Sequence, residues 1–205
     1  VGQGFVGKAY ADDFENRGFA VVRYALEEPY RANKDKIKEC DIVFIAVPTP
    51  TTPEGFSDRI VRDAVSLVGE GKTAVIKSTI LPGTTESIQK ENPDTIILHS
   101  PEFLTARNAA HEAAHPEKNI IGISIDDEKH RAAAARVMAT LPEALHSSVC
   151  SAREAELLKY GRNAMLYTQV IFMNLLYDLV EKMGASWKPL RDAYAVDPWM
   201  GRRHV

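Results

Sequence analysis

The stretch that decides the fold is the start of the chain, Val1-Gly2-Gln3-Gly4-Phe5-Val6-Gly7. It holds three glycines in the spacing Gly-x-Gly-x-x-Gly and leads into an amphipathic segment that predicts a helix to about Arg17. In dinucleotide-binding folds these glycines permit a tight turn, close approach of a pyrophosphate, and packing of the helix on the sheet. The free amides of the helix N-terminus then face the phosphates. The predicted cofactor contacts here are Gly2, Gly4, Phe5, Val6 and Gly7.

Downstream of the glycines, short apolar runs alternate with segments of helical spacing. The predicted strands are 19–25, 42–47, 74–77, 95–98 and 120–125, and the predicted helices are 58–68, 82–90 and 127–140. A continuous apolar run such as 42–47 is typical of a strand that is buried on both faces. The alternation predicts an α/β fold with a doubly wound parallel Rossmann-type sheet.

A long helix is predicted from about residue 151 to residue 183. Ser151 and Glu154 form a capping-box pattern at its start, and Gly184 is a stop signal. After Ala164 the segment is apolar on several faces, which indicates burial on several faces. We expect a dinucleotide-binding domain over 1–148 and the start of a truncated central helical domain over 149–205. We also expect a homodimer that forms through the long helix.

Composition excludes several classes of protein. The net charge of −3 and the pI of about 6.1 give no basic surface for nucleic acid. The run 42–47 is far too short to span a bilayer, so no membrane partner is expected. Two cysteines form no disulfide framework, which favours a reducing, cytoplasmic location. We expect no metal, because the pair His111 and His115 lacks an evident third ligand.

Both ends of the sequence suggest a fragment. The chain begins without an initiator methionine and without a strand before the glycines, and it stops soon after a short predicted helix.

Two loops at predicted strand ends carry candidate cofactor contacts. Val47-Pro48-Thr49 closes the run 42–47, and ligands of parallel sheets bind at the carboxyl ends of the strands. Thr79 follows the next strand, and its hydroxyl could orient a water, contact a nicotinamide or cap the following helix. We predict Val47, Pro48, Thr49 and Thr79 as cofactor contacts, and Thr79 also as a catalytic residue.

The candidate catalytic charges lie further along the chain. Glu102 follows the strand 95–98, where a carboxylate could act as a general base or hold a water. Lys159 and Asn163 stand four residues apart on one face of the long helix, where a cation and an amide could stabilise an oxyanion. Taken singly, each of these two patterns is more typical of an ordinary protein surface than of a catalytic site. The candidate catalytic residues are Thr79, Glu102, Lys159 and Asn163, and the candidate substrate contacts are Glu102, Phe103, Leu104, Lys159 and Asn163.

The order of these blocks resembles the UDP-glucose/GDP-mannose dehydrogenase family. The resemblance rests on GxGxxG at 2–7, AVPTP at 46–50, KSTxxPGTT at 77–85, SPEFL at 100–104 and KxxxN at 159–163. It implies NAD-dependent oxidation of the C6 alcohol of a nucleotide sugar to a carboxylate, in two hydride transfers through a thioester. It also implies that Lys159 and Asn163 hold the charge on oxygen, that Thr79 and Glu102 position a water, and that Glu102 assists thioester hydrolysis. The resemblance places the catalytic cysteine beyond Val205 and a nucleotide-sugar-binding domain after it.

The chain departs from the family pattern at three places. Ala25 stands where an acid usually binds the adenosine ribose, so Glu27 or Glu28 could take that role, or no residue does. Arg23 leaves NADP open beside the favoured NAD. A second glutamate of the family is Ala106 here, and a common Asn-Glu pair is Asn174-Leu175.

Several alternative functions stay open at the sequence level. UDP-glucose is the first choice of substrate, with GDP-mannose and UDP-N-acetyl-hexosamines as alternatives. The chain could instead be a catalytically incomplete nucleotide-binding or assembly module. A β-hydroxyacid dehydrogenase shares the fold, but the SPEFL and PTP blocks argue against it.

Overall fold

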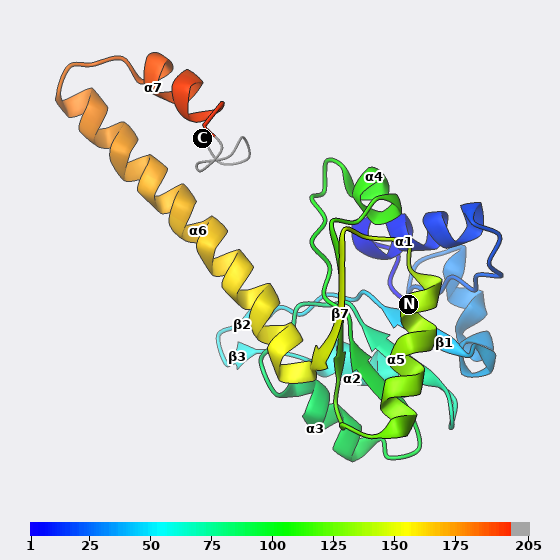
Figure 1. The fold of residues 1–205 in the computed structure, drawn as a ribbon. Helices are drawn as coiled ribbons and strands as arrows, with labels where there is room; N and C mark the ends of the chain where they lie inside the picture. The colour runs from blue at the N-terminus through cyan, green and yellow to red at the C-terminus, as the bar shows by residue number, and fades with distance from the viewer. Residues whose placement is uncertain (198–205) are drawn as a thin grey trace. The chain divides into compact units, whose positions relative to one another are not determined.

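The computed structural model describes residues 1–197. The chain forms two compact units, Val1–Lys159 and Tyr160–Val205. Residues 198–205, the end of the predicted second domain, lie outside the described residues. The strands are β1 (Ile42–Ile45), β2 (Thr51–Thr52), β3 (Gly55–Phe56), β4 (Thr73–Ile76), β5 (Ile96–His99), β6 (Lys118–Ile123) and β7 (His146–Ser151) (Figure 1). The helices are α1 (Phe5–Asn16), the 3-10 helix η1 (Tyr30–Glu39), α2 (Arg59–Val65), α3 (Thr84–Glu91), α4 (Ala109–Ala114), α5 (Glu128–Thr140), α6 (Ala152–Lys182) and α7 (Trp187–Tyr194).

The first unit is built on a five-stranded sheet in the order β1-β4-β5-β6-β7, with β2 and β3 forming a separate hairpin. The predicted Rossmann-type α/β fold is therefore confirmed. The sheet is mixed, however, because β6 runs antiparallel to β5 while the other pairs are parallel. The connection through α4 begins and ends at the same edge of the sheet, so β6 starts beside the end of β5 and runs in the opposite direction. The expectation of a wholly parallel sheet is wrong at this pair.

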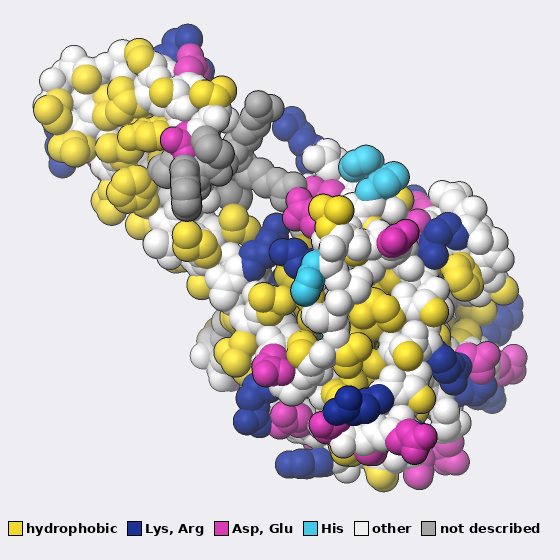
Figure 2. Space-filling view, in the orientation of Figure 1, with side chains coloured by type: hydrophobic (Ala, Val, Ile, Leu, Met, Phe, Trp, Pro, Cys, Tyr) yellow, Lys and Arg dark blue, Asp and Glu magenta, His cyan; other side chains and the backbone are white. Residues whose placement is uncertain are grey.

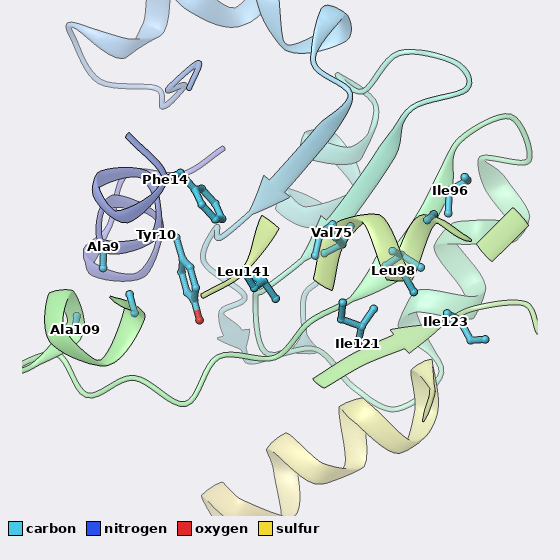
Figure 3. Close-up of a cluster of buried hydrophobic side chains, with 14 residues drawn as sticks. Ala9, Tyr10, Phe14, Val75, Ile96, Leu98, Ala109, Ile121, Ile123 and Leu141 are labelled. Carbon is cyan, nitrogen blue, oxygen red and sulfur yellow. The ribbon is translucent and has the colours of Figure 1, made fainter. Parts of the chain in front are cut away.

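Helices cover both faces of the sheet, and each face has its own apolar core. One core joins α1, α4 and α5 to the strands, and Figure 3 shows Tyr10 and Phe14 of α1 projecting toward Val75 and Leu141. The other core joins α2 and α3 to the opposite face, where Ile45, Ile76 and Ile97 are fully buried. The strands β4 and β5 are buried along their whole length, as their uninterrupted apolar runs indicate.

The predicted strand over residues 19–25 is wrong, since no residue of this segment has a strand assignment. A backbone hydrogen bond joins this segment to the start of the chain: the amide of Gly2 donates to the carbonyl of Tyr24. Val22 of this segment and Phe44 of β1 line the same cavity of about 490 Å³. The β-rich composition is present, but a strand needs a neighbouring backbone to bond with, and this segment has none along most of its length.

The predicted long helix is present as α6, and its capping box is confirmed. The amide of Ser151 donates to Glu154 Oε2 at 2.8 Å, and the amide of Glu154 donates to Ser151 Oγ at 3.3 Å. This chain alone does not cover the apolar faces of α6, because the larger side chains of the second unit are mostly exposed. Figure 2 shows hydrophobic side chains gathered on the surface of this unit. Within the described residues, α6 is covered at few positions, such as Met173 and Val180.

None of the helices in residues 1–197 combines the length and the hydropathy that a membrane span needs.

Candidate active site

The three glycines form a tight turn before α1. Gly2 has a φ of +84°, and a Cβ there would lie 2.3 Å from the carbonyl oxygen of Ala46. A Cβ on Gly7 would lie 1.9 Å from the carbonyl oxygen of Gly2, so these two positions exclude a side chain for reasons of packing. Gly4 differs, because a Cβ there would meet nothing within 4 Å. The empty space at Gly4 is on the side from which a ligand would approach the backbone.

The start of α1 offers free amides to an anion. Gly4 is the N-cap residue, no side chain caps the helix, and its first turn carries no acidic residue. The amides of Phe5, Val6 and Gly7 therefore have no intrahelical acceptor, as is usual for the first turn of a helix. Together with the helix dipole, they suit the pyrophosphate of a dinucleotide.

A cavity of about 1000 Å³ joins this turn to the predicted catalytic loops. Gln3 Oε1 is buried beside it, and no described residue donates a hydrogen bond to this oxygen, so a ligand hydroxyl would find an acceptor there. The predicted site residues that line the cavity are Gly2, Gly4, Phe5, Val6, Val47, Pro48, Thr49, Thr79 and Glu102. The geometry fits a dinucleotide in both its anion cradle and its volume.

Side-chain hydrogen bonds hold the two cofactor loops together. Ser78 Oγ accepts from the amide of Val47 at 2.9 Å and donates to the carbonyl of Val47 at 2.7 Å. The hydroxyl of Thr49 donates to the carbonyl of Thr79 at 2.8 Å. These bonds place Thr79 directly across from the Val47-Pro48-Thr49 loop. Ser78 was missing from the predicted residues, although its place beside Thr79 was a usable signal.

Glu102 and Lys159 form a buried ion pair. Lys159 Nζ donates to Glu102 Oε1 and to the carbonyl of Glu102, each at 2.7 Å, and the side chains are 7% and 12% exposed. The amide of Leu104 donates to Glu102 Oε2 at 2.7 Å. Both carboxylate oxygens are therefore held, and the lysine of α6 lies at the loop that follows β5. The structure thus brings together two of the predicted catalytic residues from positions 57 residues apart.

A second lysine, Lys77, lines the same cavity as Glu102. Its Nζ is 3.1 Å from Ser100 Oγ and 4.2 Å from the centre of the Tyr10 ring, and its side chain is buried. Burial lowers the pKa of Lys77 to about 7, against the opposing effect of Glu102. Neighbouring His99 is also buried, and burial and then Lys77 lower its pKa to about 3. Lys77 was not predicted, although a lysine directly after the apolar run 74–76 was the available signal.

Glu156 ties α6 to the loop before α3. Its fully buried carboxylate accepts hydrogen bonds from the amides of Gly83 and Thr85 and from the hydroxyl of Thr85, at 2.6, 2.9 and 2.6 Å. Glu156 thereby caps α3 from another element. It lies three residues before Lys159, on the same face of α6, so this cap also orients the lysine. No local sequence pattern indicates this role of Glu156, because only the fold reveals what it caps.

The remaining predicted residues lie outside the cavity lining. Gly7 packs on Gly2, Phe103 lies 5.8 Å from Lys159 Nζ, and Leu104 packs against the core. Asn163 is exposed and belongs to the second unit. Its role therefore remains a prediction from its spacing to Lys159.

The cysteines and histidines of residues 1–197 form no group of potential metal ligands. Burial raises the pKa of both thiols, Cys40 and Cys150, and neither lines the 1000 Å³ cavity. The rings of His111 and His115 stack with centres 4.6 Å apart. No group of three potential metal ligands occurs within residues 1–197.

Comparison with known proteins now identifies the family. The profile of the UDP-glucose/GDP-mannose dehydrogenase family, NAD binding domain, matches residues 27–141, and that of the family's central domain matches residues 153–205. The chain belongs to this family. The predicted family is therefore confirmed, and with it the NAD cofactor that the family's NAD binding domain implies.

Curated relatives in the family are longer than this chain. TuaD of Bacillus subtilis (strain 168), a UDP-glucose 6-dehydrogenase, is 31% identical over 183 residues, which cover 82% of this chain and 38% of TuaD. YtcA of the same strain is 30% identical over 186 residues, which cover 84% of this chain and 42% of YtcA. The chain thus spans about two fifths of the length of these relatives.

Solved structures share the fold. A UDP-glucose dehydrogenase from Pyrobaculum islandicum matches with a TM-score of 0.83 at 26% identity, over 99% of this chain and 57% of that one. A GDP-mannose dehydrogenase from Pseudomonas aeruginosa matches with a TM-score of 0.78 at 20% identity, over 96% and 56%. The second likeness is evidence for the fold alone.

Proposed function

We propose that this chain is the cofactor half of an NAD-dependent nucleotide-sugar 6-dehydrogenase that converts UDP-glucose to UDP-glucuronate. The observation that carries the proposal is the single cavity lined by the glycine turn, Thr79 and Glu102. UDP-glucose is favoured over GDP-mannose and UDP-N-acetyl-hexosamines because TuaD, at 31% identity, is named as a UDP-glucose 6-dehydrogenase. The structural neighbours that act on the other sugars share only the fold.

Each predicted residue has a role in this proposal. NAD, when bound, accepts the hydride in each oxidation step. Gly2, Gly4 and Gly7 shape the pyrophosphate turn, while Thr79 and Glu102 orient a water toward the reacting carbon. Lys159 stabilises negative charge on the substrate oxygen. Its ammonium is already removed from water and held in place by Glu102, so little further desolvation or reorientation is needed. Asn163, Phe103 and Leu104 are assigned to the substrate by the sequence pattern.

The chain's own thiols do not suit the covalent step of such a reaction. Cys40 and Cys150 have raised pKa values and lie outside the cavity. A thiol with a raised pKa is a poor nucleophile near neutral pH, because little of it is thiolate. The second candidate function follows from this observation: the chain binds NAD and assembles, but does not complete the oxidation.

The proposal also covers the architecture. The dinucleotide-binding domain takes 1–148, the central helical domain starts at 149, and a homodimer forms through the apolar surface of α6. Exposed Met165, Phe172 and Leu175 support such an interface. The proposed location is the cytoplasm, in keeping with two unpaired cysteines and an NAD site.

Calorimetric titration of the chain with NAD tests the proposal. The parent should bind, and Gly4→Val should lose about a hundredfold or more in affinity, since its side chain fills the space beside the backbone that the pyrophosphate needs. Gly161→Val is the matched control, because Gly161 also has open space around its Cβ position but lies on α6.

Two results would contradict the proposal. One is a folded parent chain that does not bind NAD, and the other is equal binding by the parent and Gly4→Val. Release of NADH from UDP-glucose then separates the two candidate functions. If the chain binds NAD but releases no NADH, the result supports the catalytically incomplete module. Release of at least one NADH per chain contradicts that module.

A further inference from the structure

The adenosine end of the NAD cavity contains a carboxylate at an unexpected position. Ala25, at the place where an acid would bind the ribose, is buried and has no polar side chain. The chain then passes through Leu26 and Glu27, both of which line the cavity, whereas Glu28 does not. Of the two glutamates that the sequence left open, the structure thus places only Glu27 at the cofactor.

The route of the backbone puts Glu27 near the ribose of a bound dinucleotide. The amide of Gly2 donates to the carbonyl of Tyr24 at 2.9 Å, so the segment that contains Glu27 leaves from the glycine turn itself. The adenosine ribose is joined directly to the pyrophosphate, which must lie at the start of α1. The amide of Tyr30 donates to the carbonyl of Glu27 at 3.1 Å and closes a turn that keeps the glutamate at the cavity.

The charged neighbours leave Glu27 free to accept hydrogen bonds. Lys34 also lines this end of the cavity, but no ion pair joins it to Glu27 within the described residues. Arg23, the residue that kept NADP open, is bound instead by Asp12 at 2.7 Å and by Glu15 at 2.7 and 2.9 Å. It does not line the cavity. The cation best placed by sequence to bind a 2′-phosphate is therefore engaged with carboxylates of α1.

Asp63 is another carboxylate of this cavity. Asp63 lines the same cavity from α2, where it lies 3.9 Å from Arg59. Its helix packs on β1. Asp63 has a cation beside it, whereas no ion pair holds Glu27 within residues 1–197.

We infer that Glu27 is the specificity-determining residue for NAD, accepting hydrogen bonds from the adenosine ribose in place of the acid that Ala25 replaces. A carboxylate there also repels the 2′-phosphate of NADP. The inference rests on the proposed cofactor site and adds the residue that selects between the two cofactors. It assigns to a turn residue a role that this fold usually gives to a strand end.

The test is calorimetric titration of the full chain with NAD and, separately, with NADP. Glu27→Gln should weaken NAD binding about tenfold or more, since a charge-assisted hydrogen bond is lost. It should improve NADP binding, because Lys34 then faces the 2′-phosphate without an opposing charge. Glu27→Lys should reverse the preference. Circular dichroism checks the fold of each variant, and little disturbance is expected because the side chain of Glu27 is exposed.

Two matched controls make the result specific. Glu28→Gln removes the same charge from the next residue, and Asp63→Asn removes the other cavity carboxylate that lies near the adenosine end. Both should keep the parent ratio of NAD to NADP affinity within about twofold.

The outcomes separate the inference from the proposed function. An unchanged ratio in Glu27→Gln overturns the inference, as does a ratio that changes equally in Asp63→Asn or Glu28→Gln. A folded parent chain that binds neither cofactor overturns the proposed function, and the inference with it.

Discussion

At the scale of single residues, the site depends on charges that the fold removes from water. Lys77 lies among Tyr10, Phe44 and Ser100, and no carboxylate of residues 1–197 forms an ion pair with it. Glu102 and Lys159 are buried together, so each offsets part of the desolvation of the other. At Lys77 the desolvation by burial outweighs the opposing effect of Glu102, and the pKa of Lys77 falls for that reason.

Lys77 should make the stability of the chain depend on pH. Its pKa falls from 10.5 to about 7 on folding, so between these values the unfolded chain holds more protons than the folded chain. The free energy of unfolding should therefore rise with pH from about 7 toward about 10. In Lys77→Met this rise should be smaller than in the parent, as measured by urea denaturation at about pH 7 and about pH 9.

The matched control for Lys77 is the exposed lysine of α3, in the variant Lys90→Met, which should keep the pH slope of the parent. Equal slopes in the parent and Lys77→Met would show that Lys77 stays protonated in the fold.

At the scale of elements, the buried carboxylate of Glu156 helps to hold the first turns of α6 against the start of α3. Glu156 accepts three hydrogen bonds from the start of α3, and Gly122 of β6 lets the same helix approach the sheet. A Cβ on Gly122 would lie 2.7 Å from the Cα of Ala152. These contacts decide where Lys159 emerges, one turn later on α6.

Glu156→Gln should lower the free energy of unfolding by about 2 kcal/mol, because the amide keeps one acceptor but places a donor against backbone N–H groups. Urea denaturation measures the change. Glu154→Gln is the control on the same helix, and a much smaller loss is expected since glutamine also fits a capping box. Equal losses in the two variants would refute a special role for the buried cap.

At the scale of the whole molecule, the second unit exposes several large apolar side chains along α6. Met165 is 70% exposed, Leu175 is 64% exposed and Phe172 is 53% exposed. Extended apolar surfaces of this kind commonly mark protein–protein contacts. This surface supports the proposed homodimer.

Sedimentation velocity should show that the parent self-associates at micromolar concentration. Leu175→Asp should weaken association about tenfold or more, because a charge would have to be buried in the interface. Leu145→Asp changes a residue of the first unit that is 94% exposed and should leave association unchanged. A monomeric parent, or equal association in both variants, would count against the homodimer.

The sequence by itself determined the fold class, the cofactor and the family. Glycine spacing and apolar periodicity are local features of the sequence. The five motifs of the family can likewise be recognised in the sequence without knowing how they lie in space. The long helix and its capping box were likewise readable, because Ser151 and Glu154 are only three residues apart.

Only the tertiary structure decided how these parts meet. The antiparallel direction of β6 depends on the path of the connection through α4. The lack of a strand at 19–25 depends on which backbone segments lie beside it. The Glu102–Lys159 pair and the Glu156 cap join residues 57 and at least 71 positions apart, respectively. Such pairings result from packing and burial, which no local pattern records, and so Glu27 could be separated from Glu28 only once the cavity was known.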